Sequence, residues 1–294
     1  MQTKQQIRQL LASYAIKPNK RLGQHFLIDL NLMQKLVETA QIKSDDVILE
    51  VGCGTGSLTE ELAKHADYVL AVELDKTLAN IANEQLGECK NVEILCADIL
   101  QNKNKINPVI IDKIKSARKK HSGRFLLVAN LPYNIASPLM GNLVTGPLVA
   151  DAMYVTVQKE VADRIAAGPG TKDYGTLSIL LSATGDVKKF RTLKPSVFWP
   201  APKVNSVMVS HIRKEDRAGK IKDIRLLTEL VALFMQHKRK TLLSCTKFAA
   251  GKLAKIDNWP ALFAASQINP KNRPAQITPA QYMTLANNCL KLLE

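Results

Sequence analysis

No apolar run in this 294-residue chain approaches the roughly 20 residues that a membrane-spanning helix needs. Internal repeats and low-complexity tracts are absent as well. The five cysteines include no C-x-x-C pair and no metal-ligand spacing, and their odd number rules out a complete set of intramolecular disulfides. We therefore expect a globular protein with free thiols in the reducing cytoplasm, without a membrane partner and without a metal.

Acidic residues are missing from the first 28 positions, which hold five lysines and arginines. A basic segment without acids is typical of a transit peptide. Here, however, residues Gln5–Tyr14 have the pattern of an amphipathic helix, and they lead directly into Arg21–Phe26, which we assign to the predicted site. We therefore favour residues 1–28 as a basic arm of the folded protein over a transit peptide.

Charge is distributed unevenly along the chain, which carries a formal net charge of +15 at pH 7. Residues 31–100 hold 5 Lys and Arg against 13 Asp and Glu, whereas residues 101–130 hold 8 against 1 and residues 211–294 hold 15 against 6. An acidic segment between basic ones indicates a cationic cofactor in one part and a polyanion in the other. Solvated lysine faces would explain any single cluster, but the whole distribution favours nucleic acid.

Short apolar runs alternate with amphipathic helical patterns through the first half of the chain. The runs are rich in Val, Ile and Leu and apolar on both faces, as parallel strands covered by helices require. The predicted strands are Val47–Val51, Tyr68–Glu73, Val92–Cys96, Phe125–Ala129 and Ala152–Gln158. The predicted helices between them are Leu58–His65, Thr77–Leu86 and Ser137–Leu143. This order predicts an α/β fold with a Rossmann-like, mostly parallel sheet.

The pattern changes after Gln158. Two late strands, Val187–Thr192 and Val204–Ile212, are expected to form an antiparallel hairpin that closes the sheet. A polar stretch from Arg213 to Lys222 suits a linker, and the remainder is helical in pattern. The predicted helices there are Ile224–Met235, Lys240–Gly251 and Pro279–Leu293. We therefore predict two domains, residues 1–210 with the sheet and residues 211–294 as a small all-α, RNA-binding domain.

Three features point to a nucleoside-containing cofactor. The first strand runs into the glycine-rich turn Gly52-Cys53-Gly54-Thr55-Gly56, whose glycines let the backbone approach a ligand without Cβ clashes. Glu73 ends the second strand, where a carboxylate can accept both hydroxyls of a ribose, and Asp98 follows the third strand, within reach of an adenine edge. Each feature alone would suit a tight turn or a solvated acid. Together they predict a cofactor site at the carboxyl edge of the sheet.

The fourth strand leads into Asn130-Leu131-Pro132-Tyr133. The side-chain carbonyl of Asn130 and the backbone carbonyl of Leu131 can accept the two hydrogens of an exocyclic amino group. Pro132 fixes φ and helps to aim the Leu131 carbonyl, and Tyr133 offers a face for stacking a base. The motif predicts methyl transfer to adenine, in which alignment dominates over acid–base chemistry. Phe198, in a proline-rich loop, is expected to cover the other face of the base.

These motifs resemble those of the ribosomal RNA adenine dimethyltransferase family, whose members are class I methyltransferases. The resemblance keeps the order of the motifs and extends over nearly the full chain. The resemblance is carried by Lys20–Leu27, Gly52–Gly56, Val72–Asp75, Ala97-Asp98, Asn130–Asn134, Gln158–Val161, Asp173–Gly175, Phe198–Ser206 and Lys238–Leu242. It implies S-adenosylmethionine as the cofactor and small-subunit (16S) rRNA in the pre-30S subunit as the partner. Two adjacent adenosines in a hairpin near the 3′ end would each be methylated twice at N6. We expect a monomer.

The resemblance also implies roles for individual residues. Those implied to contact the cofactor are Gln24, His25, Leu27, Gly52, Gly54, Gly56, Glu73, Asp98 and Asn130. Those implied to surround the target base are Asn130, Leu131, Pro132, Tyr133 and Phe198.

The chain departs from the family pattern in three places. His25 stands where Asn is usual, and Ala129 stands where Gly is common. The stretch from Gln101 to Gly123 is longer and more basic than usual, and it suits either an added RNA contact or a disordered loop.

Three other functions compete with this interpretation. A large-subunit rRNA methyltransferase of the antibiotic-resistance type is the nearest, but Lys238–Leu242 and Gly168–Gly175 favour the small-subunit type. A DNA adenine methyltransferase is less favoured, since its acceptor motif usually begins with Asp. A non-catalytic ribosome-assembly or transcription factor on the same fold would not need Glu73, Asp98 and Asn130 together.

Overall fold

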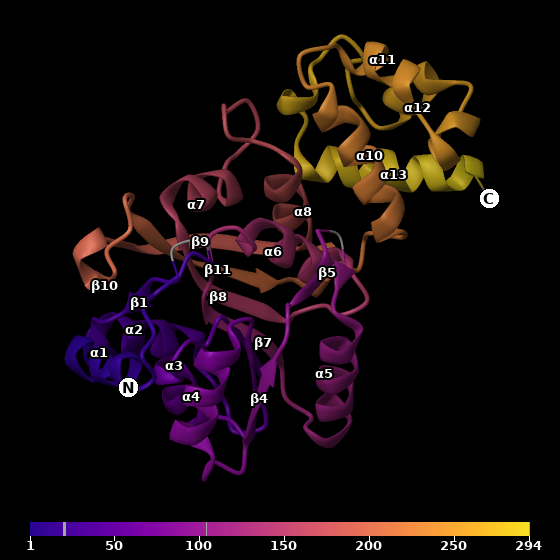
Figure 1. The fold of residues 1–294 in the computed structure, drawn as a ribbon. Helices are drawn as coiled ribbons and strands as arrows, with labels where there is room; N and C mark the ends of the chain where they lie inside the picture. The colour runs from indigo at the N-terminus through magenta and orange to yellow at the C-terminus, as the bar shows by residue number, and fades with distance from the viewer. Residues whose placement is uncertain (20–21, 104, 294) are drawn as a thin grey trace. The chain divides into compact units, whose positions relative to one another are not determined.

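The computed structural model describes residues 1–19, 22–103 and 105–293, which form two compact units (Figure 1). Unit 1 comprises Met1–Ala162 and Lys188–Ile212, and unit 2 comprises Asp163–Val187 and Arg213–Glu294. Unit 2 therefore includes a segment, residues 163–187, that the prediction assigned to the sheet domain. Lys20 and Arg21 of the predicted arm, and Asn104 of the basic stretch, lie outside the described residues.

A seven-stranded sheet has the strand order β4-β3-β2-β7-β8-β11-β9 (Figure 1). Neighbours from β4 to β8 run parallel, and β11 runs antiparallel to β8. The strands are β2 (Val47–Val51), β3 (Tyr68–Glu73), β4 (Val92–Cys96), β7 (Phe125–Asn130), β8 (Ala152–Gln158), β9 (Gly185–Leu193) and β11 (Ser206–Arg213). The predicted Rossmann-like, mostly parallel sheet is confirmed, and the two last strands, β9 and β11, lie next to each other in it.

Helices cover both faces of this sheet. On one face, Leu36 and Leu62 pack against Ile48 and Val128. Val92 of β4 packs against the same cluster, so the next residue, Glu93, points to the opposite face. There Glu93 forms an ion pair with Lys113, which belongs to a helix on that face. The helices of unit 1 are α1 (Lys4–Ser13), α2 (Leu30–Ala40), α3 (Ser57–Ala63), α4 (Lys76–Leu86), α5 (Pro108–Lys120) and α6 (Ala136–Thr145), and α7 (Lys159–Ile165) crosses from unit 1 into unit 2.

The basic stretch after residue 100 is ordered where the structure describes it. It forms the hairpin strands β5 (Leu100–Asn102) and β6 (Lys105–Ile106), followed by helix α5. Asn107 caps α5 and Pro108 occupies its first turn. Ile110, Ile114 and Ala117 are buried at helical spacing, which ties α5 to the rest of unit 1. The disordered-loop alternative for this stretch is therefore wrong.

Unit 2 is helical around an aromatic core. Phe234 lies within 6.3 Å of the rings of Trp259, Phe263 and Tyr282. The hydroxyl of Tyr282 donates to the Pro274 carbonyl oxygen at 2.9 Å. The helices are α8 (Thr176–Thr184), α9 (Glu215–Ala218), α10 (Ile224–Gln236), α11 (Leu242–Cys245), α12 (Trp259–Ala265) and α13 (Pro279–Leu293), with 3₁₀ turns η3 (Thr246–Phe248), η4 (Gly251–Lys255) and η5 (Pro274–Gln276).

One predicted helix of unit 2, Lys240–Gly251, is wrong. The α-helix ends at Cys245, and the 3₁₀ turn η3 follows. Leu242 and Cys245 are buried, but Thr246, Lys247 and Phe248 are not, so there is no apolar face to continue the α-helix. None of the described helices is both long and apolar enough to cross a membrane.

A buried carboxylate joins the starts of the two central strands. Asp46 is completely buried and accepts hydrogen bonds from the backbone N–H of Arg124 at 2.8 Å and from its guanidinium Nη2 at 2.6 Å. Asp46 also accepts from the backbone N–H of Lys43 at 2.9 Å. Because Asp46 precedes β2 and Arg124 precedes β7, this pair sets the relative position of the strands that carry Gly52 and Asn130.

Replacement of Asp46 by Ala should lower the free energy of unfolding by about 3 kcal/mol, because it leaves buried donors without an acceptor. Urea denaturation of Asp46→Ala measures this. Arg118→Ala is the control, since Arg118 and Asp151 are 3.5 Å apart and both partly exposed. It should change stability by less than about 1 kcal/mol. Equal losses in the two variants would contradict the role of Asp46.

Candidate active site

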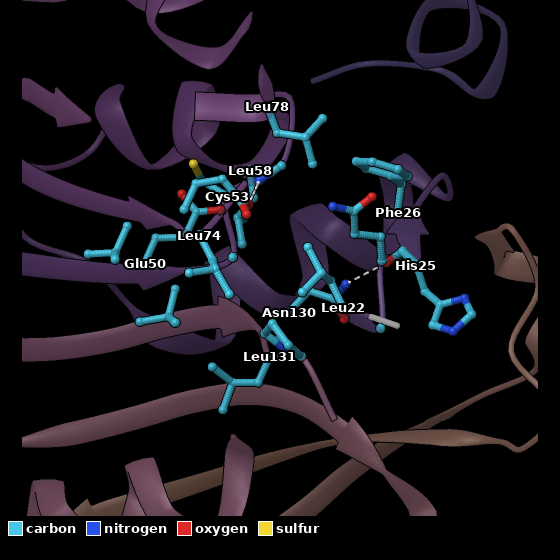
Figure 2. A pocket seen from close by; sticks show the side chains of 18 of the residues that line it. Leu22, His25, Phe26, Glu50, Cys53, Leu58, Leu74, Leu78, Asn130 and Leu131 are labelled. Carbon is cyan, nitrogen blue, oxygen red and sulfur yellow. Dashed lines mark hydrogen bonds between the residues drawn. The ribbon is translucent and has the colours of Figure 1, made fainter. Parts of the chain in front are cut away.

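A cavity lies at the carboxyl edge of the sheet, in unit 1 (Figure 2). Its wall includes residues that follow β2, β3, β4 and β7, and residues 22–27 of the N-terminal segment. The strand β1 (Phe26–Leu27) holds that segment by pairing with β10 (Phe198–Trp199). The structure thus brings the predicted cofactor residues other than Gly56, together with the Asn130–Tyr133 motif, to one cavity.

The glycine turn contributes backbone without side chains to this cavity. Gly52 has φ +77°, and a Cβ there would lie 3.0 Å from the ring of Pro132. Gly54 has φ +59°, and a Cβ there would lie 2.9 Å from Cε1 of Phe26. Gly56 serves differently: it precedes α3 and does not line the cavity, and a Cβ there would lie 2.8 Å from Leu86. Gly52 and Gly54 therefore let the turn pack against Pro132 and Phe26 in the cavity wall, whereas Gly56 allows close packing on α4.

Glu73 is held by the backbone at the end of β3. Its Oε2 accepts from the N–H of Gly54 and its Oε1 from the N–H of Asp75, each at 2.9 Å. Burial raises the pKa of this carboxyl above its ordinary value, while these N–H groups oppose the shift. Each oxygen retains lone pairs that can accept further hydrogen bonds. The Glu73 carboxylate can therefore still accept donors from a ligand in the cavity.

The other predicted cofactor residues differ in how firmly they are fixed. Gln24 donates from Nε2 to Asp75 at 3.1 Å, and Asp75 caps helix α4, so the N-terminal segment is tied to the cofactor edge. Leu27 is buried in the cavity wall. Asp98 is exposed at the rim, where its Oδ1 accepts from the N–H of Leu100 at 2.9 Å.

Glu50 is a residue of the cavity that the sequence analysis did not identify. It lies within β2, is only 2% exposed, and its Oε2 has no hydrogen-bond partner among the described residues. Burial raises its pKa to about 8. A carboxylate in the otherwise apolar strand Val47–Val51 was the available signal. Among the described lining residues there are no lysines or arginines, so the cavity is suited to a cation rather than to a pyrophosphate.

Asn130 is fixed by the backbone of the N-terminal segment. Its Nδ2 donates to the carbonyl oxygen of His25 at 3.0 Å, shown by a dashed line in Figure 2. The N–H of Leu131 donates to the carbonyl oxygen of Thr156 at 3.1 Å. With the amide nitrogen engaged, the side-chain carbonyl of Asn130 is the end available to accept from an amine.

Tyr133 is held from two sides. Its hydroxyl lies 3.1 Å from Oγ of Ser206, and burial raises its pKa. The imidazole of His25 stacks on its ring, with centroids 5.5 Å apart and planes at 30°. His25 is itself fixed, because Nδ1 lies 2.6 Å from the carbonyl oxygen of Pro200. His25 thus supports Tyr133, and in Figure 2 its ring points away from Asn130.

The structure does not bring Phe198 to the cavity. Phe198 pairs with Leu27 across strands β10 and β1, is 3% exposed, and packs in the core beside Leu193 and Met208. Alternation along β10 sends the neighbouring Trp199 the other way, where it stacks on Phe26. In this structure Phe198 is therefore not placed to cover a base in the cavity, as the sequence had predicted.

Gln2 is a second residue that the sequence did not indicate. It is buried, and its Oε1 accepts from Oγ1 of Thr55 at 2.6 Å while its Nε2 donates to the Thr55 carbonyl at 3.1 Å. Its backbone N–H donates to Ser57 Oγ at 2.7 Å. These bonds brace the glycine turn from outside the sheet. No local pattern around Gln2 predicts a contact so distant in sequence.

Comparison with known proteins is consistent with this geometry. A family model described as ribosomal RNA adenine dimethylase matches residues 15–291. The chain belongs to this family. Ribosomal RNA small subunit methyltransferase A of Alkaliphilus oremlandii is 38% identical over 97% of this chain and 96% of its own length. The protein of the same name from Geobacillus sp. (strain WCH70) is 34% identical over 95% of this chain and 94% of its own length.

Solved structures of rRNA methyltransferases share the fold of this family member. A dimethyladenosine transferase from Plasmodium falciparum has a TM-score of 0.67 at 24% identity, covering 87% of this chain and 94% of that one. The 23S rRNA methyltransferase ErmE has a TM-score of 0.61 at 22% identity, covering 90% and 98%. The ribosomal RNA adenine dimethylase family implies use of S-adenosylmethionine, and a cavity lined by Glu73 and without described lysines or arginines fits that cation.

Replacement of Gly54 by Ala should weaken S-adenosylmethionine binding at least about 10-fold, because the new Cβ meets Phe26 and the φ is strained. Isothermal titration calorimetry measures the affinity. Gly170→Ala is the matched control: Gly170 has φ +80° but nothing within 4 Å of an added Cβ. Gly170→Ala should lower the stability of the protein through the same backbone strain but should bind S-adenosylmethionine with the wild-type affinity. Normal affinity in Gly54→Ala would contradict the role of the close Gly54–Phe26 packing in shaping the cofactor site.

Replacement of Glu50 by Gln should stabilise the protein at pH 8 and hardly affect it at pH 5. Because the folded-state pKa of Glu50 is raised to about 8, the unfolded chain loses this proton at lower pH, and stability falls as pH rises between the two pKa values. Glutamine has no proton to lose, so the gain at pH 8 should be on the order of 2–4 kcal/mol. Thermal unfolding across pH tests this against the exposed-site control Glu88→Gln. A gain independent of pH would refute the assignment.

Proposed function

We propose that this protein transfers methyl groups from S-adenosylmethionine to N6 of two adjacent adenosines in a hairpin near the 3′ end of small-subunit (16S) rRNA. The product is N6,N6-dimethyladenosine, formed during maturation of the 30S subunit. The observation that carries the proposal is the anchoring of Asn130 beside the nucleoside-type cavity. The names of the small-subunit relatives, at 33–38% identity, support the choice of RNA.

On the cofactor side, Glu73, which accepts from the N–H of Gly54, would accept the ribose hydroxyls, and the turn at Gly52 and Gly54 would line the cofactor site. Asp98, at the rim of the cavity, would accept from the adenine edge. The bound cofactor supplies an electrophilic methyl group on a sulfonium. We place Gln24, His25 and Leu27 as the cover of this half, with Gln24 acting through Asp75.

On the acceptor side, Asn130 accepts one hydrogen of the adenine amino group through its side-chain carbonyl. The Leu131 carbonyl accepts the other, with its direction set by Pro132. Holding both hydrogens favours a pyramidal nitrogen whose lone pair points at the methyl group. Tyr133 stacks on the base, and its position depends on Ser206 and His25. The amine proton leaves to water after transfer, so the chain needs no dedicated general base.

We further propose that unit 2 and the basic face of α5 bind RNA phosphates, that the protein works as a monomer, and that it acts in the cytoplasm on pre-30S subunits. The division into a catalytic domain, residues 1–210, and a helical RNA-binding domain, residues 211–294, belongs to this proposal. Residues 163–187 group with the helical unit and would be part of the RNA-binding surface.

The test combines purified protein, labelled S-adenosylmethionine and ribosomal subunits from cells that lack the protein. Mass spectrometry of the rRNA should find dimethyladenosine in 30S and not in 50S material. Methylation confined to 50S would favour the resistance-type alternative. No methylation of either subunit, with tight subunit binding, would favour a non-catalytic assembly factor.

Replacement of Asn130 by Ala should lower the single-turnover rate of methyl transfer by at least about 100-fold, because one aligned acceptor at the reacting amine is lost. The measurement uses saturating cofactor and pre-30S subunits, since Asn130 also borders the cofactor. Asn83→Ala, at an exposed position of α4, is the control and should keep the wild-type rate. A wild-type rate in Asn130→Ala would show that another group holds the amine.

A further inference from the structure

Phe248 in unit 2 is an aromatic side chain left exposed, with 46% of its surface accessible. It ends the 3₁₀ turn η3. The imidazole of His237 stacks on its ring with centroids 4.0 Å apart and planes at 20°. The ammonium Nζ of Lys240 lies 5.5 Å from the ring centroid. Phe248 thus forms a nearly parallel stack with His237, has a cation over its ring and remains half-exposed to solvent.

The backbone holds this stack in place. His237 ends helix α10, and its carbonyl oxygen accepts from the N–H of Lys240 at 2.8 Å and from Sγ of Cys245 at 3.6 Å. Thr241 caps the next helix, accepting from the N–H of Ser244 at 3.2 Å. His237 and Phe248 are therefore presented by a fixed turn, which reduces the entropy lost when a ligand binds.

Charge around the stack has one sign. Lys238, Arg239 and Lys240 are all exposed in the turn, and Lys247 is exposed next to Phe248. The sequence from His237 to Ile256 holds six Lys and Arg residues and no Asp or Glu. These cations have no acid within their own segment, which favours an anionic partner. We name His237–Lys240 together with Lys247-Phe248 the stacking turn.

An aromatic plane among exposed cations matches the chemistry of single-stranded nucleic acid. Stacking a base on an aromatic ring contributes about 1–3 kcal/mol, and it requires a base that is not already stacked in a duplex. A purely phosphate-binding surface would need the cations but not the planar stack. Phe248 offers no hydrogen-bond donor or acceptor, so base identity would matter little.

We propose that the stacking turn binds an unpaired RNA nucleotide, whose base stacks on Phe248 while Lys238, Arg239 and Lys247 contact the adjacent phosphates. The inference deepens the proposed function, because rRNA would supply the unpaired segment. The turn would thus hold a nucleotide outside the catalytic cavity, and its contribution would appear in substrate affinity and not in the chemical step.

The test uses the full-length protein and a labelled 10-nucleotide single-stranded RNA, with the same sequence as a duplex for comparison. Phe248→Ala should bind the single strand about 10-fold more weakly by fluorescence anisotropy. Phe248→Trp, which keeps an aromatic ring, should bind the single strand as tightly as the wild type. Leu292→Ala, which removes a 61% exposed aliphatic side chain in the same unit, is the control and should bind like the wild type. Circular dichroism confirms that each variant is folded.

Salt dependence separates stacking from charge. Phe248→Ala should leave the slope of log affinity against log salt unchanged, whereas Lys238→Gln and Lys247→Gln should each reduce it by about one. The proposal is overturned if Phe248→Ala binds the single strand normally, if duplex binding weakens equally, or if an acidic peptide depends on Phe248 to the same degree.

Activity distinguishes this inference from the proposed function. With pre-30S subunits, Phe248→Ala should raise KM and keep the wild-type kcat. A lower kcat with unchanged KM would overturn the role of the stacking turn while methylation itself stands. Absence of methylation by the wild-type protein would sink the proposed function, and the oligonucleotide measurements would still decide whether the turn binds RNA.

Discussion

Parallel hydrogen bonding of β2 to its two neighbours is the constraint on which the active site depends. Val51 pairs with Val72 of β3, and Leu49 pairs with Leu127 of β7, so the carboxyl ends of the three strands meet at one edge. That register brings the glycine turn, Glu73 and Asn130 together from positions far apart in the chain. The ion pair between buried Asp46 and partly exposed Arg124 joins β2 and β7 at the opposite ends of these strands.

Polar bonds then join the two halves of the site. Glu73 accepts from the glycine turn, Gln24 donates to Asp75, and Asn130 donates to the carbonyl of His25. Residues 22–27 therefore bridge the cofactor edge and the acceptor motif. Since methyl transfer depends on alignment of donor and acceptor, this bridge is how the fold couples the two positions. His25 contributes to this bridge in two ways: its backbone carbonyl accepts from Asn130, and its imidazole stacks on Tyr133.

Local patterns predicted the parts of the fold that depend on neighbours in sequence. Predominantly apolar runs predicted β2, β3, β4 and β8 with the observed bounds, and position at a strand end indicated Glu73 and Asn130. Helix α5 was not predicted because its charged face obscured the buried Ile110 and Ile114. The break after Cys245 was missed because the propensities of residues 246–250 alone do not oppose a helix.

The sequence by itself determined which functional motifs follow which strands. Along the chain these motifs are a glycine turn, an acid, a second acid and an amide motif, each at the end of a strand. Only the tertiary structure decided which side chains face the cavity. The side chain of Phe198 lies in the core and that of Glu50 lines the cavity. Side chains alternate between the two faces of a strand, so the pairing register decides which face each one occupies. That register is set by pairing between segments that are distant in sequence. The bracing of Thr55 by Gln2 has the same origin.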